Sequence, residues 1–113
     1  MPEYPEAARR EIRKIRDRAY EIELSEALGE LESGFSDWRK GHIDCFQLTD
    51  LVHGFHQGPQ RRLYNYYANV KVPTAAAYAI ASGLVPRDEV PPVVLEALDR
   101  DIRIQQELRR DRE

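Results

Sequence analysis

The stretch from residue 6 to residue 33 constrains the fold more than any other part of the chain. It contains no proline and a single glycine, Gly29, and residues that favour helices dominate it. Proline breaks a helix interior and glycine weakens one, so this stretch predicts one long N-terminal helix that is free to bend at Gly29. The apolar residues of its first half recur every three or four positions: Ala8, Ile12, Ile15, Ala19 and Ile22. This spacing is typical of a coiled-coil seam, which requires a facing helix.

The apolar pattern then changes phase. The later positions keep the same spacing but are displaced around the helix: Leu24, Leu28, Leu31, Phe35 and Trp38. We expect the second half to pack on the core of the domain and the narrow first half to pack on a partner chain.

Charge is also segregated along the helix. Residues 9–18 hold six Arg or Lys and two acidic residues, whereas residues 21–32 hold five Glu and no base. Two such helices in antiparallel order would set basic halves against acidic halves, which favours a homodimer through the N-terminal helix. The alternative is a solvated amphipathic helix whose charges serve solubility. The net charge of −3 and the pI near 5.7 disfavour a nucleic-acid partner.

The rest of the chain also reads as helical. Gly41 is expected to close a short helix that carries Phe35 and Trp38, and Asp44 with Gln47 forms a potential capping box for the next helix. We expect Gly58-Pro59 to end that helix and to start another that runs to about residue 68. Further helices are predicted over 74–82 and from 92 to about 110, joined by a proline-rich connector with one helical turn. The prediction is all-α: a compact bundle of about five or six helices in a single domain 1–113, with the long helix 6–33 and the bundle 35–110.

Composition limits the setting of the protein. The one cysteine, Cys45, excludes an intramolecular disulfide and fits a reducing cytoplasm, and we expect it to be a small buried filler. No apolar run is long enough to span a bilayer, and no signal peptide precedes the first helix. We therefore expect a cytoplasmic protein with no membrane association.

The most suggestive cluster of polar residues lies on the predicted helix before Gly58. Asp50 and His53 are three residues apart, as are His53 and His56, so they could form a carboxylate–imidazole pair or a metal site for an enzyme. The simpler interpretation is two histidines on a solvated or partner-facing side. No known catalytic motif is present, so we expect no catalytic residue, no cofactor and a non-enzymatic protein.

Residues 45–69 allow a second interpretation. Two helices around a tight Gly58-Pro59 turn would resemble a helix-turn-helix, and the second helix carries Arg61 and Arg62 near its start, as recognition of nucleic acid requires. Nearby acidic residues oppose a polyanion, and pairing with carboxylates explains the arginines equally well. The expected functional surface, whichever partner it serves, comprises His53, His56, Arg61, Arg62 and Tyr64.

One resemblance supports this surface. The residues that carry it are Phe35, Trp38, Gly41, Ile43, Phe46, Leu48, Asp50, Leu51, His53, Phe55, His56, Gly58, Arg62, Leu63 and Tyr64. This pattern resembles that of a group of short bacterial proteins of uncharacterised function, over about two-thirds of the chain. The resemblance implies a bacterial cytoplasmic protein and no particular activity. The amphipathic helices and the segregated charges lead us to expect a non-enzymatic interaction or regulatory module that acts as a homodimer or on another protein.

Overall fold

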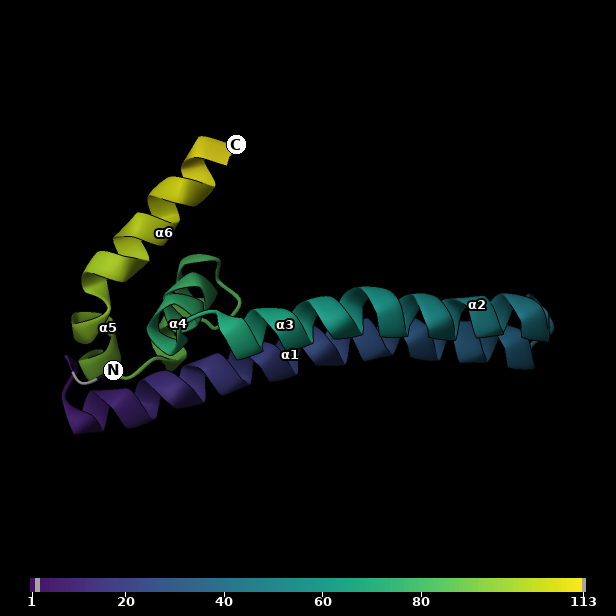
Figure 1. The fold of residues 1–113 in the computed structure, drawn as a ribbon, viewed down its shortest axis with the longest axis horizontal. Coiled ribbons are helices and arrows are strands. Elements are labelled where there is room, and N and C mark those ends of the chain that lie inside the picture. Colours follow the sequence, from purple (N-terminus) through teal and green to yellow (C-terminus); the bar gives the residue numbers. More distant parts are fainter. Residues whose placement is uncertain (2, 113) are drawn as a thin grey trace. The chain divides into compact units, whose positions relative to one another are not determined.

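The computed structural model describes residues 1 and 3–112, and this part of the chain is all-α, without a strand (Figure 1). The elements are α1 (Glu6–Arg39), α2 (Cys45–Phe55), the π-helical turn η1 (His56–Gln60), α3 (Arg61–Asn69), α4 (Val72–Ala81), the 3-10 turn η2 (Arg87–Glu89), α5 (Pro92–Ala97) and α6 (Asp99–Arg112). The predicted fold class is confirmed. Among the described residues, no helix combines the length and apolar character required to cross a bilayer.

The chain divides into two compact units, where the sequence predicts a single domain. Unit 1 comprises residues 1–20 and 69–113, and unit 2 comprises residues 21–68. The boundary falls inside α1, close to the point where the apolar pattern of this helix changes phase. The phase change therefore marks where α1 exchanges one set of packing neighbours for another.

Helix α1 is longer than predicted, because it continues through Gly34 to Arg39. Gly41 closes it with φ of 78°, as expected for the left-handed residue at a helix C-terminus. The amide of Gly41 donates to the carbonyl of Trp38 and the amide of His42 donates to that of Asp37, which is the Schellman pattern. The predicted stop at Gly41 is confirmed, and the separate short helix before it is wrong.

The capping box that begins α2 is confirmed. The backbone N–H of Gln47 donates to Oδ1 of Asp44 over 2.7 Å, and the backbone N–H of Asp44 donates to Oε1 of Gln47 over 2.9 Å. These bonds satisfy two of the amides that a helix start leaves without a partner.

Gly58-Pro59 does not separate two helices, contrary to the prediction. The flanking residues Phe55, His56 and Arg61 all keep right-handed helical backbone angles, and the chain passes from α2 to α3 through one π-helical turn. Proline lacks an N–H and clashes with the carbonyl four residues earlier, and the wider π turn accommodates it. In Figure 1, α2 and α3 accordingly follow one another as a nearly continuous rod.

Unit 2 is a helical hairpin in which the second half of α1 lies antiparallel to α2, η1 and α3 (Figure 1). The helices come close at Gly34, which is buried and where an added Cβ would lie 2.8 Å from Cδ1 of Leu51. At the other end, the hydroxyl of Tyr67 donates to Oε2 of Glu23 over 2.8 Å. The large side chains buried in the hairpin are Leu48, Leu63 and Tyr67.

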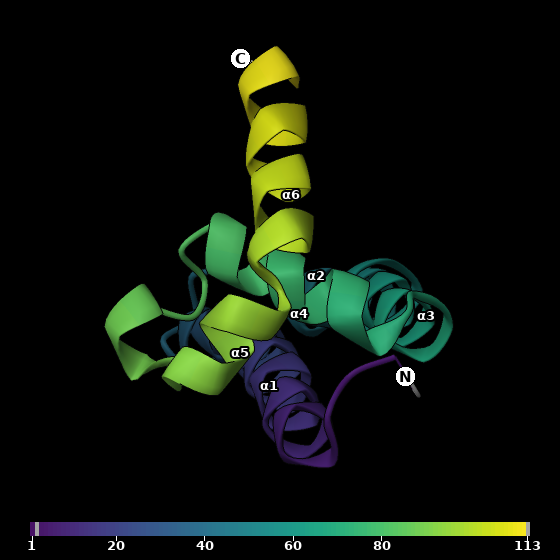
Figure 2. The same ribbon diagram turned by 90° about the vertical axis from the view of Figure 1, so that its left-hand side faces the viewer.

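More apolar side chains are buried in unit 1 than in unit 2. The core of unit 1 contains the small-residue face of α4, whose alanines allow neighbouring helices to approach closely, and α6 packs on α4 and α5 (Figure 2). The buried residues are Ala8, Ile12, Ile15, Ala19, Ala75, Ala76, Ala77, Ala79, Ile80, Val85, Val90, Val94, Leu98 and Ile102. The helix predicted from residue 92 to about 110 is interrupted at the buried Leu98, which separates α5 from α6.

The N-terminal lead-in of unit 1 is attached to α6. The hydroxyl of Tyr4 donates to Oδ2 of Asp101 over 2.9 Å. Partial burial of the ring, the hydrogen bond and the charge of Asp101 together raise the pKa of Tyr4 to about 12. The phenol therefore stays protonated and able to donate over the whole neutral range.

Candidate functional site

The predicted functional surface lies on the outer side of the hairpin. Its five residues are all exposed: His53, His56, Arg61, Arg62 and Tyr64. Nδ1 of His56 and Oε1 of the neighbouring Gln60 form a hydrogen bond over 3.0 Å within the π-helical segment. The structure therefore places these residues on one continuous helical rod.

No metal site forms at Asp50, His53 and His56. In the part of the chain that the structure describes, no group of three or more His, Cys, Asp or Glu side chains could hold a metal ion. Asp50 instead borders a groove of about 240 Å³ on the side of α2 that faces α1, where Glu30 contributes a second carboxylate. The remaining lining of this groove is largely apolar.

The helix-turn-helix that residues 45–69 allow as an alternative interpretation is not formed. That motif requires two helices joined by a tight turn at roughly 90–120°. Here the π-helical turn keeps α2 and α3 in line, and both Arg61 and Arg62 are exposed at the start of α3. No separate recognition helix projects from this segment.

Two expectations about burial are corrected. Cys45 is exposed and not a buried filler, because it lies in the first turn of α2, on a side that α1 does not cover. The apolar side of α2 is also only partly covered: Leu48 is buried, whereas Leu51 and Val52 are exposed. One facing helix covers a narrow stripe of α2, and no second layer lies over the remainder within unit 2.

The seam that the sequence assigns to a partner chain is covered by unit 1 itself. The exposed fraction of its side chains is between 0 and 6% for Ala8, Ile12, Ile15 and Ala19. A second copy therefore finds no apolar face on the first half of α1. A homodimer through this helix, as predicted, must use another face.

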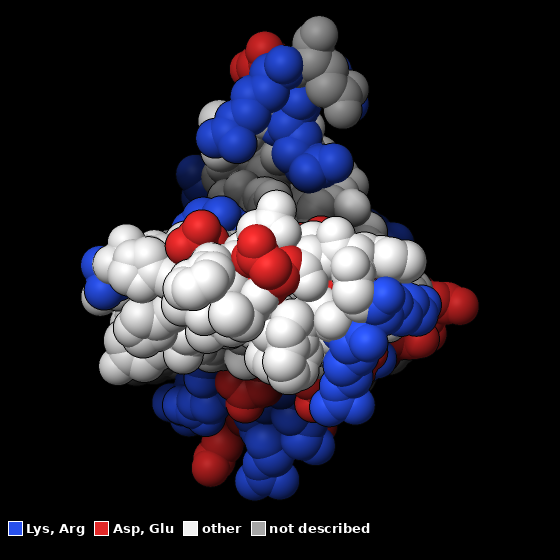
Figure 3. All heavy atoms as spheres, turned by 90° about the vertical axis from the view of Figure 1, so that its right-hand side faces the viewer, with Lys and Arg blue, Asp and Glu red and all other residues white. Residues whose placement is uncertain are grey.

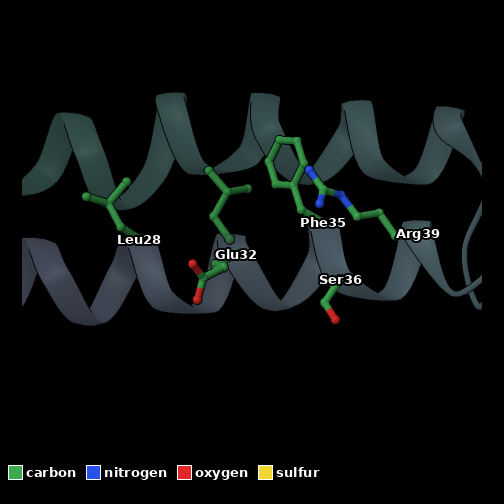
Figure 4. A pocket seen from close by; sticks show the side chains of 6 residues that line it. Leu28, Glu32, Phe35, Ser36 and Arg39 are labelled. Carbon is green, nitrogen blue, oxygen red and sulfur yellow. The ribbon is translucent and has the colours of Figure 1, made fainter.

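Such a face exists on the second half of α1, which the sequence assigns to the core. Leu28, Phe35 and Trp38 are exposed, which contradicts that assignment. An open groove of about 470 Å³ runs along this face between Leu28 and Arg39 and includes Glu32 (Figure 4). In Figure 4, Phe35 and Arg39 extend towards the facing helix, whereas Ser36 points away from it. We name this surface the α1 groove.

The closed end of the hairpin is also weakly charged. Figure 3 faces this end, where α1 meets α2, and uncharged side chains cover most of it. Phe46, at the start of α2, is 78% exposed, and Trp38 belongs to the same end of α1. Exposed aromatic side chains of this kind are enriched at protein–protein interfaces.

The sequence indicates that this side of α1 is apolar, because the apolar residues from Leu24 to Trp38 recur at helical spacing. It does not indicate that this side is exposed, because the number of helices that cover it cannot be read from the spacing.

Comparison of the chain with protein-family models, with curated proteins and with solved structures found no match.

Proposed function

We propose that this protein is a non-enzymatic interaction module that acts as a homodimer through the hairpin of unit 2. The observation that carries the proposal is the contrast between the two units. Unit 1 has a contiguous core made by several elements, whereas the hairpin buries three large side chains and leaves its largest apolar residues in water: Leu28, Phe35, Trp38, Phe46, Leu51, Val52 and Tyr64.

Two physical arguments support self-association. A segment as short as residues 21–68 rarely builds a sufficient core from two helical layers, and oligomerisation is a common remedy. Large apolar side chains exposed together in a contiguous patch are typical of interaction sites. A second hairpin on the first would supply the two additional helices of a four-helix bundle, which buries apolar side chains from all four helices.

The test measures the molar mass of the full chain by sedimentation equilibrium over a range of concentrations. We expect a dimer of twice 13.2 kDa. Leu28→Ser should weaken the dimer by about tenfold or more. Burial of the exposed half of Leu28 at the interface contributes ~1 kcal/mol to the free energy of association, and both copies lose this contribution.

Leu108→Ser is the matched control. Leu108 lies in unit 1 and has the same exposed fraction as Leu28, 47%, so its loss should leave the association unchanged if the hairpin is the interface. Equal effects of the two variants would indicate nonspecific adhesion, and a monomer at millimolar concentration would rule out the proposed function.

A further inference from the structure

The α1 groove carries two charges that have no partner. Glu32 and Arg39 are both exposed, and neither makes an ion pair or a side-chain hydrogen bond among the residues that the structure describes. Both line the groove beside Phe35 (Figure 4). They are seven residues apart on one helix, about 10 Å along its axis, which is too far for them to pair with each other.

We infer that the occupant of the α1 groove is the same groove of a second copy, with the two α1 helices antiparallel and Glu32 of each copy paired with Arg39 of the other. This inference rests on the homodimer proposed above and specifies its geometry.

The pairing follows from two-fold symmetry. In a two-fold dimer each residue contact occurs twice, with the roles of the copies exchanged. If the axis passes between Phe35 and Ser36, antiparallel order brings each Glu32 opposite Arg39 of the second copy. The two Phe35 rings then meet near the axis, and Trp38 lies opposite Ser33 of the second copy. The apolar centre and both ion pairs form together.

The charges also select this register over its neighbour. An axis at Ser33 would bring Leu28 opposite Trp38 of the second copy and overlap more of the apolar stripe. It would also bring the two Glu32 carboxylates together and place Arg39 beside the uncharged Ala27. Parallel helices would likewise set Glu32 against Glu32 and Arg39 against Arg39. Like charges across an interface act against an arrangement, so both alternatives are disfavoured.

The experiment is a charge exchange in the full chain, with the dissociation constant measured by sedimentation equilibrium at low salt. We expect Glu32→Arg alone and Arg39→Glu alone each to weaken the dimer by about tenfold or more, because each places like charges together at two symmetric positions. The double variant E32R/R39E should restore wild-type affinity to within about threefold, because opposite charges face each other again. Far-UV circular dichroism confirms that each variant is folded.

Two further variants separate the alternatives. Arg13→Glu changes an exposed charge in the first half of α1, which is outside the α1 groove, and should leave the affinity unchanged. Glu32→Gln should weaken the proposed dimer, whereas it would tighten a dimer with its axis at Ser33.

Each outcome supports or overturns the inference. If the wild type dimerises and the single charge variants dimerise equally well, the Glu32–Arg39 geometry is overturned while the proposed function stands. The same holds if the double variant does not recover the affinity of the wild type. A mass above that of a dimer would indicate an open, non-two-fold contact and would also overturn this geometry. A wild-type chain that stays monomeric at millimolar concentration overturns both, and the groove would then belong to a different protein.

Discussion

At the scale of single residues, the hydrogen bond from Tyr4 to Asp101 makes a testable contribution to the stability of unit 1. We expect Tyr4→Phe to lower the free energy of unfolding by ~1 kcal/mol at neutral pH, because Asp101 loses a donor and no compensating bond is formed. Urea denaturation followed by circular dichroism measures this difference.

The same residue predicts a pH dependence. The pKa of Tyr4 is raised in the folded state from 10.0 to about 12, so the folded chain holds this proton more tightly than the unfolded chain does. The stability that this proton contributes is fully present below about pH 10 and is lost as the pH rises towards about 12. The stability difference between wild type and Tyr4→Phe should therefore shrink over that range. A difference that stays constant to pH 12 would contradict the raised pKa.

At the scale of secondary-structure elements, the glycines of α1 and of its C-terminus should respond in opposite directions. An added Cβ at Gly29 meets nothing within 4 Å and its φ is not positive, so Gly29→Ala should stabilise the hairpin by about 0.5–1 kcal/mol. Gly41 has φ of 78°, so Gly41→Ala should destabilise it by about 1 kcal/mol or more. Thermal unfolding at one fixed protein concentration compares the two variants.

Gly34 provides an intermediate case. An added Cβ would lie 2.8 Å from Cδ1 of Leu51, but Leu51 is exposed and its side chain can move. Gly34→Ala should therefore gain less than Gly29→Ala. A destabilised Gly29→Ala would show that something approaches the backbone of α1 at that position, contrary to the open space there.

Local signals explain which elements were predictable. Gly41 and the Asp44–Gln47 capping box act through backbone geometry within a few residues, and both behave as predicted. Gly58-Pro59 was misread because proline normally ends a helix, whereas one π-helical turn accommodates it here. The predicted helix ends at residue 33, whereas α1 continues through Gly34, which lies close to Leu51 of the facing helix, to Arg39.

At the scale of the whole molecule, the sequence shows which side of a helix is apolar but not what covers that side. The seam from Ala8 to Ala19 and the stripe from Leu28 to Trp38 have the same spacing, yet the first is buried within unit 1 and the second is exposed. The difference depends on residues far away in the sequence, because α4 to α6 supply a core to unit 1, whereas within unit 2 the second half of α1 faces α2, η1 and α3. The sequence pattern therefore identified the apolar side of α1 but not its exposure to solvent.

This division predicts that the two units differ in how their stability depends on protein concentration. Because dimerisation favours the associated state by mass action, a hairpin completed by a second copy gains stability as the concentration rises. Hydrogen exchange followed by mass spectrometry on peptides should show amide protection in residues 45–68 that increases with concentration across the dimerisation range. Peptides from α4 and α6 should show protection that does not change, because the core of unit 1 is complete within one chain.

The variants Glu32→Arg and Leu28→Ser should remove the concentration dependence from the hairpin peptides and leave α4 and α6 unaffected. Protection that rises equally in both units would mean that the chain unfolds as one cooperative body, and equal, constant protection would mean that the hairpin is stable without a second copy.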